Sequence, residues 1–338
     1  MRAKKLPSGN YRAIASKTVN GERIRKSFTA STKNEAELLA VAWVARGKEQ
    51  EELPTVGEIL DRYIEHREAV LSPSTIAGYI KLLPHIKKRL GRIVASDMTS
   101  EMLQAYANEL AIDHAPKTVK NYMNLLIPAL NSVMPDVKYH VTYPKREPLT
   151  YNIPDDNAIN ALISHSKGDM RLCIILGAKG LRRGEICALK HKDVLRDLHA
   201  VYVHADMVKD KDGKWIYKPI PKTASSIRRV ELPPEIMDII PDGEPEDFII
   251  KHPPSYVTDR FCELRNSLGL SCRFHDLRHY SASLLHALGI PDQYIQEQHG
   301  WRTDQTLKAV YRNTIKERSV RFAKKANDEF MEVIKKSI

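Results

Sequence analysis

The stretch CRFHDLRHYSAS, residues 272–283, decides how this chain is interpreted. It opens an apolar run that predicts a helix ending before Pro291. Residues three apart share a helix face, so His275 and Arg278 can point at one target. Imidazole can donate or move a proton, and guanidinium can bind two phosphate oxygens. Taken alone, the four residues HDLR fit a helix start with solvated polar groups equally well.

Four further segments contain side chains suited to the same chemistry. They are GLRRGEICAL (residues 180–189) with Arg182, PKT (221–223) with Lys222, HGW (299–301), and LKAVYRN (307–313) with Tyr311. Each also has a simpler interpretation. Arg182 can pair with Glu185, which we expect to be a structural brace. Lys222 can be an exposed turn lysine, with Arg228 and Arg229 as basic rivals nearby.

The order of these elements is arginine, lysine, His-x-x-Arg, His or Trp, and tyrosine, and it resembles the tyrosine recombinase (phage integrase) family. The resemblance covers the chain from about Thr150 onward, and the N-terminal half more weakly. The order and spacing of five elements make it specific, where no single element would. It implies the following catalytic residues: Arg182, Lys222, His275, Arg278 and Tyr311.

A sixth active-site position stays open between two residues. In the family, a His or Trp usually precedes the tyrosine at a short fixed distance. Trp301 fits that register better than His299, but either can fill the position. An indole N–H would pack and donate a hydrogen bond there.

Breaking a phosphodiester without a metal needs a nucleophile, cations on the non-bridging oxygens and an acid for the leaving oxygen. Tyr311 suits the first role, Arg182 and Arg278 the second, and Lys222 the third, while His275 can donate to an oxygen or accept the tyrosyl proton. The sequence has no Gly-rich nucleotide-binding loop and no C-x-x-C pair among its four cysteines. We therefore expect no cofactor and no metal, and cysteines that are reduced and buried.

The chain is long enough, at 338 residues, for two or three domains. Its formal net charge of +11 favours a polyanionic partner, and nucleic acid and acidic membrane both fit that charge. No apolar run is long enough to span a bilayer, and no apolar signal core follows the N-terminus. We expect a cytoplasmic, DNA-associated protein of a bacterial cell without a membrane partner.

Residues 1–50 read as a small basic unit, with two strands joined by a turn at Asn20–Gly21 and a helix capped by Thr32. The unit is similar to the arm-type DNA-binding domain of many phage integrases. A charged edge that prevents aggregation is the alternative interpretation. The candidate DNA-binding residues of this unit are Arg12, Lys17, Arg23, Arg25 and Lys26.

Residues 54–134 read as an all-helical unit that resembles the family's core-DNA-binding domain. A capping box at Thr55 and Glu58 opens its first helix, and Pro84 is expected to end or kink the second. Residues 135–150, rich in proline and without a period, read as a linker. The candidate DNA-binding residues of the helical unit are Lys87, Lys88, Arg89, Lys117 and Lys120.

Residues 151–338 read as a mixed α+β catalytic domain, mainly helical with a small antiparallel sheet. Three strands are expected, at 200–203, 215–220 and 228–232, with a turn at 210–213 between the first two and Lys222 in the turn before the third. The tail from about residue 315 reads as an amphipathic helix. In the family such tails link protomers into a tetramer on DNA, but packing on its own domain fits equally well.

The favoured function is site-specific recombination of double-stranded DNA at attachment sites through a 3′-phosphotyrosine, which would integrate or excise a phage or mobile element. A catalytically silent DNA-binding protein and a type IB topoisomerase-like relaxing enzyme are the alternatives. The resemblance also implies a homo-tetramer on DNA, a host DNA-bending factor and an accessory protein for excision.

Overall fold

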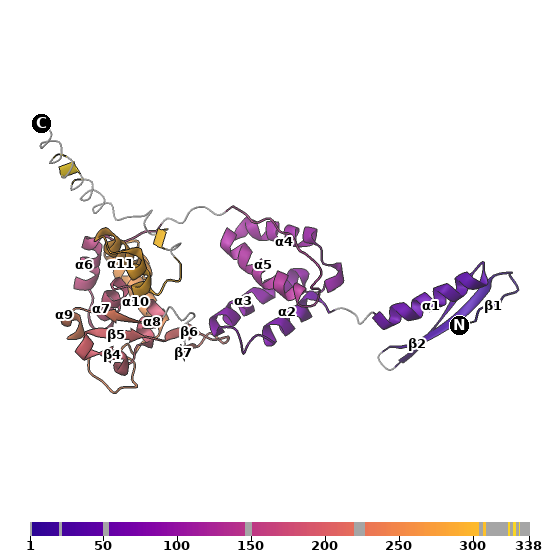
Figure 1. Ribbon diagram of the computed structural model, residues 1–338, viewed down its shortest axis with the longest axis horizontal. Helices are drawn as coiled ribbons and strands as arrows, with labels where there is room; N and C mark the ends of the chain where they lie inside the picture. Colours follow the sequence, from indigo (N-terminus) through magenta and orange to yellow (C-terminus); the bar gives the residue numbers. More distant parts are fainter. Residues whose placement is uncertain are drawn as a thin grey trace. The chain divides into compact units, whose positions relative to one another are not determined.

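The computed structural model describes residues 2–19, 22–49, 54–145, 151–219, 227–303 and 307–308, with single positions at 324, 327, 328 and 331. By its internal contacts the chain divides into two compact units, residues 1–66 with 82–144 and residues 67–81 with 145–338. Figure 1 shows mainly helices with small antiparallel sheets, which confirms the predicted fold class. The domain boundaries given above stay predictions.

A three-stranded antiparallel sheet and one helix form the N-terminal part. The sheet order is β1 (Lys4–Lys5), β2 (Tyr11–Val19) and β3 (Glu22–Ala30), followed by α1 (Lys33–Glu49). Ala13 and Ala15 are buried against Ala36 and Ala40 of α1. As predicted, Thr32 accepts a hydrogen bond from a first-turn amide of the helix. The strands pair in hairpin register, while the turn at Asn20–Gly21 lies outside the described residues.

Four helices follow in the described part of the chain up to residue 145. They are α2 (Val56–Glu65), α3 (Pro73–Leu90), α4 (Ser100–Asp113) and α5 (Pro116–Asn131). The capping box predicted at Thr55 and Glu58 is present at the start of α2. Leu103, Leu110 and Leu126 are buried among these helices.

Proline 84 does not end α3, which continues to Leu90. A proline inside a helix removes one ladder hydrogen bond and costs about 3 kcal/mol. Ile76 lies before it and Ile86 and Leu90 after it, and all three are buried. Their burial favours a helix that runs through the proline, because each buried aliphatic side chain contributes about 1.5–3 kcal/mol.

The remaining helices and strands belong to residues 151–303. The helices are α6 (Asp156–Ser164), α7 (Gly168–Ala178), α8 (Arg183–Ala188), α9 (Pro234–Met237), α10 (Pro254–Ser267), α11 (Asp276–Ala287) and α12 (Asp292–His299). The strands are β4 (Val194–Leu195), β5 (Ala200–Val203), β6 (Asp206–Lys209), β7 (Trp215–Lys218) and β8 (Arg228–Glu231). In the described part of the chain, no helix combines the length and the apolar character needed to cross a membrane.

The strands form two small sheets, where the sequence predicted one run of three strands. One sheet has the order β4-β5-β8, and the other pairs β6 with β7. The turn at residues 210–213 therefore joins β6 to β7, and β5 pairs with β8 directly. Strand β6 escaped prediction because Asp206 and Lys209 at its ends mask its short apolar centre.

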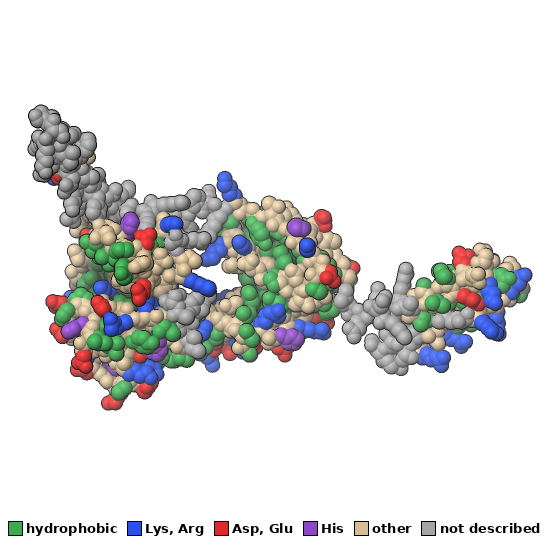
Figure 2. Space-filling view, viewed as in Figure 1, with side chains coloured by type: hydrophobic (Ala, Val, Ile, Leu, Met, Phe, Trp, Pro, Cys, Tyr) green, Lys and Arg blue, Asp and Glu red, His purple; other side chains and the backbone are tan. Residues whose placement is uncertain are grey.

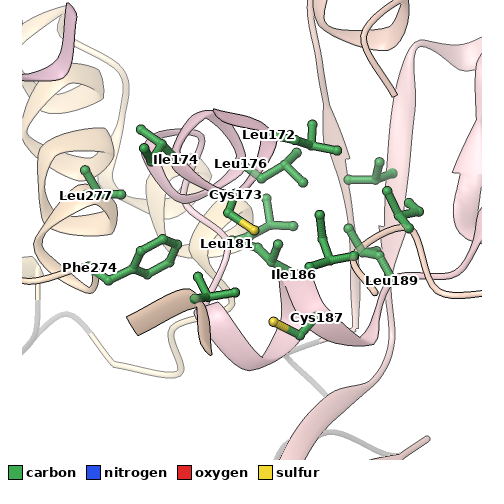
Figure 3. Packing of buried hydrophobic residues seen from close by; sticks show 14 of the residues in the cluster. Leu172, Cys173, Ile174, Leu176, Leu181, Ile186, Cys187, Leu189, Phe274 and Leu277 are labelled. Atoms are coloured by element: carbon green, nitrogen blue, oxygen red, sulfur yellow. The ribbon is translucent and has the colours of Figure 1, made fainter. Parts of the chain in front are cut away.

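Helix α7 lies in the hydrophobic core of residues 151–303 (Figure 3) and packs against α6, α8, α10 and α11. Its nearly continuous apolar sequence is explained by this position, because a helix covered on all sides has no polar face. Leu277 of α11 comes so close that a Cβ added at Gly177 would lie 3.1 Å from its Cδ1. This close packing fixes the position of α11. It thereby also fixes the first turn of that helix, which carries His275 and Arg278.

Helix α4 offers a matched test of the helical core. Leu110 is 2% exposed and Ile112 is 80% exposed. We expect Leu110→Ala to lower the opening free energy of α4 amides by about 2–5 kcal/mol, because it leaves a cavity. Ile112→Ala should change that energy by less than about 0.5 kcal/mol. Native-state hydrogen exchange of the full chain measures both values, and equal effects would contradict this packing.

Candidate active site

Helix α11 begins at the residues that the sequence singled out. His275 is its N-cap and remains exposed, whereas the Arg278 side chain is only 1% exposed. The guanidinium of Arg278 donates to the carbonyl oxygens of Gly180 and His299 and lies 5.3 Å from the centre of the Trp301 ring. Its Nε is buried and has no partner among the described residues.

The turn between α7 and α8 places the other arginine. Gly180 has φ +103°, a conformation that favours glycine, and it directs the chain into Arg182 at the N-cap of α8. Glu185 accepts a hydrogen bond from the Arg182 backbone amide at 2.8 Å and from its Nη1 at 2.6 Å. The Arg182 side chain is 32% exposed, so it can reach a ligand while it is held by Glu185.

The C-terminus of α12 contacts these two arginines and a third. Gly300, with φ +57°, and Trp301 close the helix through backbone hydrogen bonds to Glu297 and Gln296. The next carbonyl groups of a helix end have no partner within the helix and carry its partial negative charge. Three arginines from three different elements bind them: Arg228 binds Gln298 at 2.7 Å, Arg278 binds His299, and Arg182 binds Gly300 at 3.3 Å.

Glu185 joins these arginines from the other side. It is 3% exposed and pairs with Arg182 and with Arg228 at 2.8 Å, and it lies 3.9 Å from Arg278. Burial raises the pKa of this carboxyl group, but the hydrogen bonds and charge of Arg228, then the charges of Arg182 and Arg278, bring it to about 2. Glu185 is therefore ionised and neutralises part of the cationic cluster, as expected of a brace.

Two histidines at the start of α11, the N-cap His275 and His279, have lowered pKa values. Desolvation, followed by the charges of Arg278 and Arg182, lowers the pKa of His275 to about 4. Desolvation, followed by the charge of His275, does the same for His279. The His275 ring keeps an exposed edge and meets the buried His279 ring at 5.0 Å in a T-shaped contact. A neutral imidazole can accept one proton, so His275 is suited to that role.

The two candidates for the sixth position differ in burial. His299 is fully buried, and its Nδ1 lies 2.9 Å from the Ile295 carbonyl oxygen, so Nδ1 must donate and Nε2 can only accept. A Cβ added at Gly180 would lie 2.8 Å from that Nε2. Trp301 is half-buried and packs with Leu307 against α11 and α12.

Asp206, at the start of β6, lies against the same turn. A Cβ at Gly184 would overlap its Oδ1. Burial and the negative charge of Glu185 raise the pKa of Asp206 to about 6, against the opposing charges of Arg182 and Lys218. The register pairs Asp206 with Lys218, so this carboxyl group joins the β6–β7 hairpin to the Arg182 turn.

The predicted residues Lys222 and Tyr311 lie outside the described residues. Their neighbours in the sequence are described. Strand β7 ends at Lys218, four residues before Lys222. Leu307, four residues before Tyr311, is fully buried with Ala282 and Ile295. The described structure thus brings together Arg182, His275, Arg278, His299 and Trp301.

The basic residues predicted in the N-terminal sheet divide between its two faces. Arg12, Arg23 and Arg25 lie on the open face, where Arg12 contacts Thr29 and Arg23 contacts Ser16. Lys26 lies on the α1 side, with its Nζ 5.8 Å from the centre of the Phe28 ring. Lys17 is placed by its backbone alone, opposite Ile24. Figure 2 shows Lys and Arg side chains along the sheet side of this part.

The basic residues predicted in the helical part have different surroundings. Lys87 pairs with Asp61 at 2.6 Å, and Arg89 pairs with Glu109 at 2.8 Å. The Lys120 ammonium lies 5.9 Å from the centre of the Tyr143 ring. The remaining two, Lys88 and Lys117, are exposed.

Arg228 is a buried residue whose contacts the sequence did not predict. The sequence presents it only as a basic rival to Lys222, yet its side chain is 3% exposed. The predicted strand contained a signal, because residues two apart share a face and Val230 and Leu232 are apolar. An arginine in line with them needs a buried partner, and that partner is Glu185.

Residues 155–318 match the family model described as the phage integrase family. This segment includes the whole arginine cluster and ends beyond the tyrosine candidate. Residues 155–318 are therefore a domain of the phage integrase, or tyrosine recombinase, family.

Particular relatives extend the similarity over most of the chain. A tyrosine recombinase XerC-like protein of Caldanaerobacter subterraneus subsp. tengcongensis is 24% identical, over 92% of this chain and 94% of its own. The Tn1549 transposon integrase, solved in complex with transposon right end DNA, is 15% identical, with a TM-score of 0.63 over 81% of this chain and 99% of its own. A lambda integrase tetramer bound to a Holliday junction is 18% identical, with a TM-score of 0.59 over 92% and 95%. The two structures show a shared fold.

The buried histidines predict acid sensitivity. The ordinary histidine pKa is about 6.5. Burial, then the Arg278 charge, lowers the pKa of His299 to about 3, so between these values the unfolded chain binds a proton that the folded chain does not. The free energy of unfolding should therefore fall as pH drops below about 6.5. His275 and His279 add to this slope, and Asp206, with its raised pKa, opposes it.

His299→Asn isolates one contribution to that slope, because the amide can still donate to the Ile295 carbonyl but does not titrate. We expect the variant to be less stable at neutral pH and to show a shallower loss of unfolding free energy between about pH 6.5 and 5.5, above the range where ordinary carboxylates titrate. Urea unfolding at several pH values measures the slope. An unchanged slope would mean that His299 titrates normally.

Proposed function

We propose that this protein is a site-specific DNA recombinase of the integrase type, which cleaves and rejoins DNA strands through a covalent 3′-phosphotyrosine. The observation that carries the proposal is the convergence of Arg182, His275 and Arg278 where α8, α11 and α12 meet. Two guanidinium groups and a neutral imidazole form a set of donors and acceptors suited to a phosphodiester. The chain then continues from α12 toward Tyr311.

Each residue has one role in the proposed reaction. Tyr311 Oη attacks phosphorus, the bond to the 5′ oxygen breaks, and Lys222 gives that oxygen a proton. His275, neutral because of its lowered pKa, takes the tyrosyl proton. Arg182 and Arg278 stabilise the charge on the non-bridging oxygens. Attack by a 5′ hydroxyl group reverses the step, so the phosphotyrosine supplies the energy for rejoining.

For the sixth position we favour Trp301. Trp301 is half-buried with its ring centre 5.3 Å from the Arg278 guanidinium, whereas His299 is fully buried with its Nε2 against Gly180. In this assignment Trp301 keeps water from Arg278 and can donate to the phosphate through its indole N–H. His299 supports the turn beneath it.

The proposed partner is double-stranded DNA at attachment sites, which places the enzyme in the bacterial cytoplasm. The Tn1549 and lambda integrases were solved on DNA, the latter as a tetramer, and both share this fold. By the same resemblance we propose a homo-tetramer on DNA, with a host DNA-bending factor and an excision accessory protein as further partners. Integration or excision of a phage or mobile element is the proposed biological outcome.

Covalent trapping tests the reaction. The protein first selects its sequence from a library of genomic fragments that flank its gene, and the selected duplex is then nicked near its centre. We expect wild type to form a denaturation-resistant adduct and Tyr311→Phe to form none while binding equally well. Tyr294→Phe, at an exposed tyrosine of α12, is the matched control and should behave as wild type.

Absence of an adduct with wild type, on DNA that it selects and binds, would contradict the recombinase proposal and leave a silent DNA-binding protein. An adduct that persists in Tyr311→Phe would move the nucleophile to another residue. Relaxation of a supercoiled plasmid without exchange between two duplexes would favour the topoisomerase-like alternative.

The open face of the N-terminal sheet gives a separate test of DNA binding. Arg12→Ala and Arg25→Ala should each weaken binding and lower the slope of log K against log salt concentration by about 1, because each removes one phosphate contact. Lys26→Ala removes the same charge from the α1 side and should leave the slope unchanged. Salt titrations monitored by fluorescence anisotropy measure the slopes, and three equal slopes would contradict the proposed face.

A further inference from the structure

Arg228 is a buried arginine that contacts Glu185, the carboxylate bound to Arg182 of the proposed site. Arg228 opens β8, and its side chain is 3% exposed in line with the buried Val230 and Leu232. Its Nη1 and Nη2 donate to the two carboxylate oxygens of Glu185 at 3.1 and 2.8 Å. Its Nε donates to the Gln298 carbonyl oxygen at 2.7 Å.

These contacts join parts of the chain that are far apart in the sequence. Glu185 holds the Arg182 backbone and guanidinium, so Arg228 determines where the carboxylate that orients Arg182 lies. Gln298 belongs to the last turn of α12, which leads to Trp301. One planar guanidinium therefore sets the spacing between the Arg182 turn and the end of α12.

We propose that Arg228 is a positioning residue of the recombinase reaction, which fixes Glu185 and the C-terminus of α12 to each other so that Arg182 and Trp301 meet the same phosphate. This inference rests on the proposed function. Arg228 itself does not touch the DNA.

The chemistry of a buried ion pair supports a positioning role over a stabilising one. Removing two charges from water costs about as much as their attraction returns, and apolar replacements often stabilise a protein. The ion pair can instead fix the geometry of a site, because a guanidinium group directs several donors at fixed angles. A lysine could satisfy Glu185 or the Gln298 carbonyl group, but one ammonium cannot reproduce the fork.

The neighbouring arginine provides a matched control. Arg229 is 51% exposed and pairs with Glu231 at 3.4 Å, so it lies on the opposite face of β8. Arg228→Met and Arg229→Met remove the same charge and fork from adjacent positions. Arg228→Lys keeps the charge and loses the fork.

The experiment measures single-turnover adduct formation at saturating DNA, together with the Kd for DNA. We expect Arg228→Met to slow cleavage by roughly 100-fold, as for a small displacement of catalytic groups, with an unchanged Kd. Arg228→Lys should recover part of the rate, and Arg229→Met should match wild type. Circular dichroism at the assay temperature confirms that each variant is folded.

The pH profile separates positioning from general destabilisation. Without Arg228, Glu185 loses the largest of the contributions that lower its pKa, so that pKa rises above the wild-type value. The Arg228→Met rate should then fall as the pH is lowered toward that raised pKa, and wild type should show no such fall in the same pH range. Arg228→Lys should lack the fall, since it keeps a positive charge beside the carboxylate.

A folded Arg228→Met protein that cleaves at the wild-type rate overturns the inference. If Arg228→Met does not fold, Arg228→Lys decides: a full wild-type rate in that variant overturns the inference, and a reduced rate with unchanged Kd supports it. If wild type and Arg229→Met form no adduct, the proposed function fails and the inference fails with it. If wild type and Arg229→Met form the adduct and only the Arg228 variants lose it, both the proposed function and the inference are supported.

Discussion

The end of α12 exposes three successive carbonyl groups, and guanidinium groups from the α7–α8 turn, β8 and α11 bind them. A helix C-terminus carries partial negative charge, so it attracts cations that would otherwise repel one another. Glu185 supplies the full negative charge on the other side of the cluster. Three arginines can thus lie close together without DNA phosphate to separate them. The site's geometry depends on this arrangement, because each arginine touches both the carboxylate and the helix end.

The same cluster explains the protonation states around it. Arginines remain charged in proteins, and their positive charge disfavours the protonated form of a nearby imidazole, so the imidazole pKa falls. His275 and His299 both have lowered pKa values for this reason, after desolvation. Their exposure gives them different uses. The first has an exposed edge and can exchange a proton with a substrate, while the second is enclosed and orders the backbone around Ile295.

Residues in regular periodic patterns were predictable from the sequence. The helix that starts at His275, the strand at Ala200–Val203 and the capping box of α2 occur where the patterns placed them. Contacts between distant residues were not predictable, because no local pattern encodes them. Strand β6 was missed because the charged residues at its two ends hide its short apolar centre, and α3 continues through Pro84 because tertiary packing outweighs a local penalty. The Glu185 brace was expected, but its second arginine was found only in the structure.

Gly180 has a consequence for how this sequence can change. Its φ of +103° needs glycine, its carbonyl group anchors Arg278, and the space for a side chain is occupied by the His299 ring. Positions 180 and 299 therefore cannot vary independently. A larger residue at 180 would be strained by this φ and would also displace the His299 ring, which supplies the donor that the Ile295 carbonyl group now has. Redesign of DNA specificity would accordingly leave this pair untouched and alter side chains on the open faces.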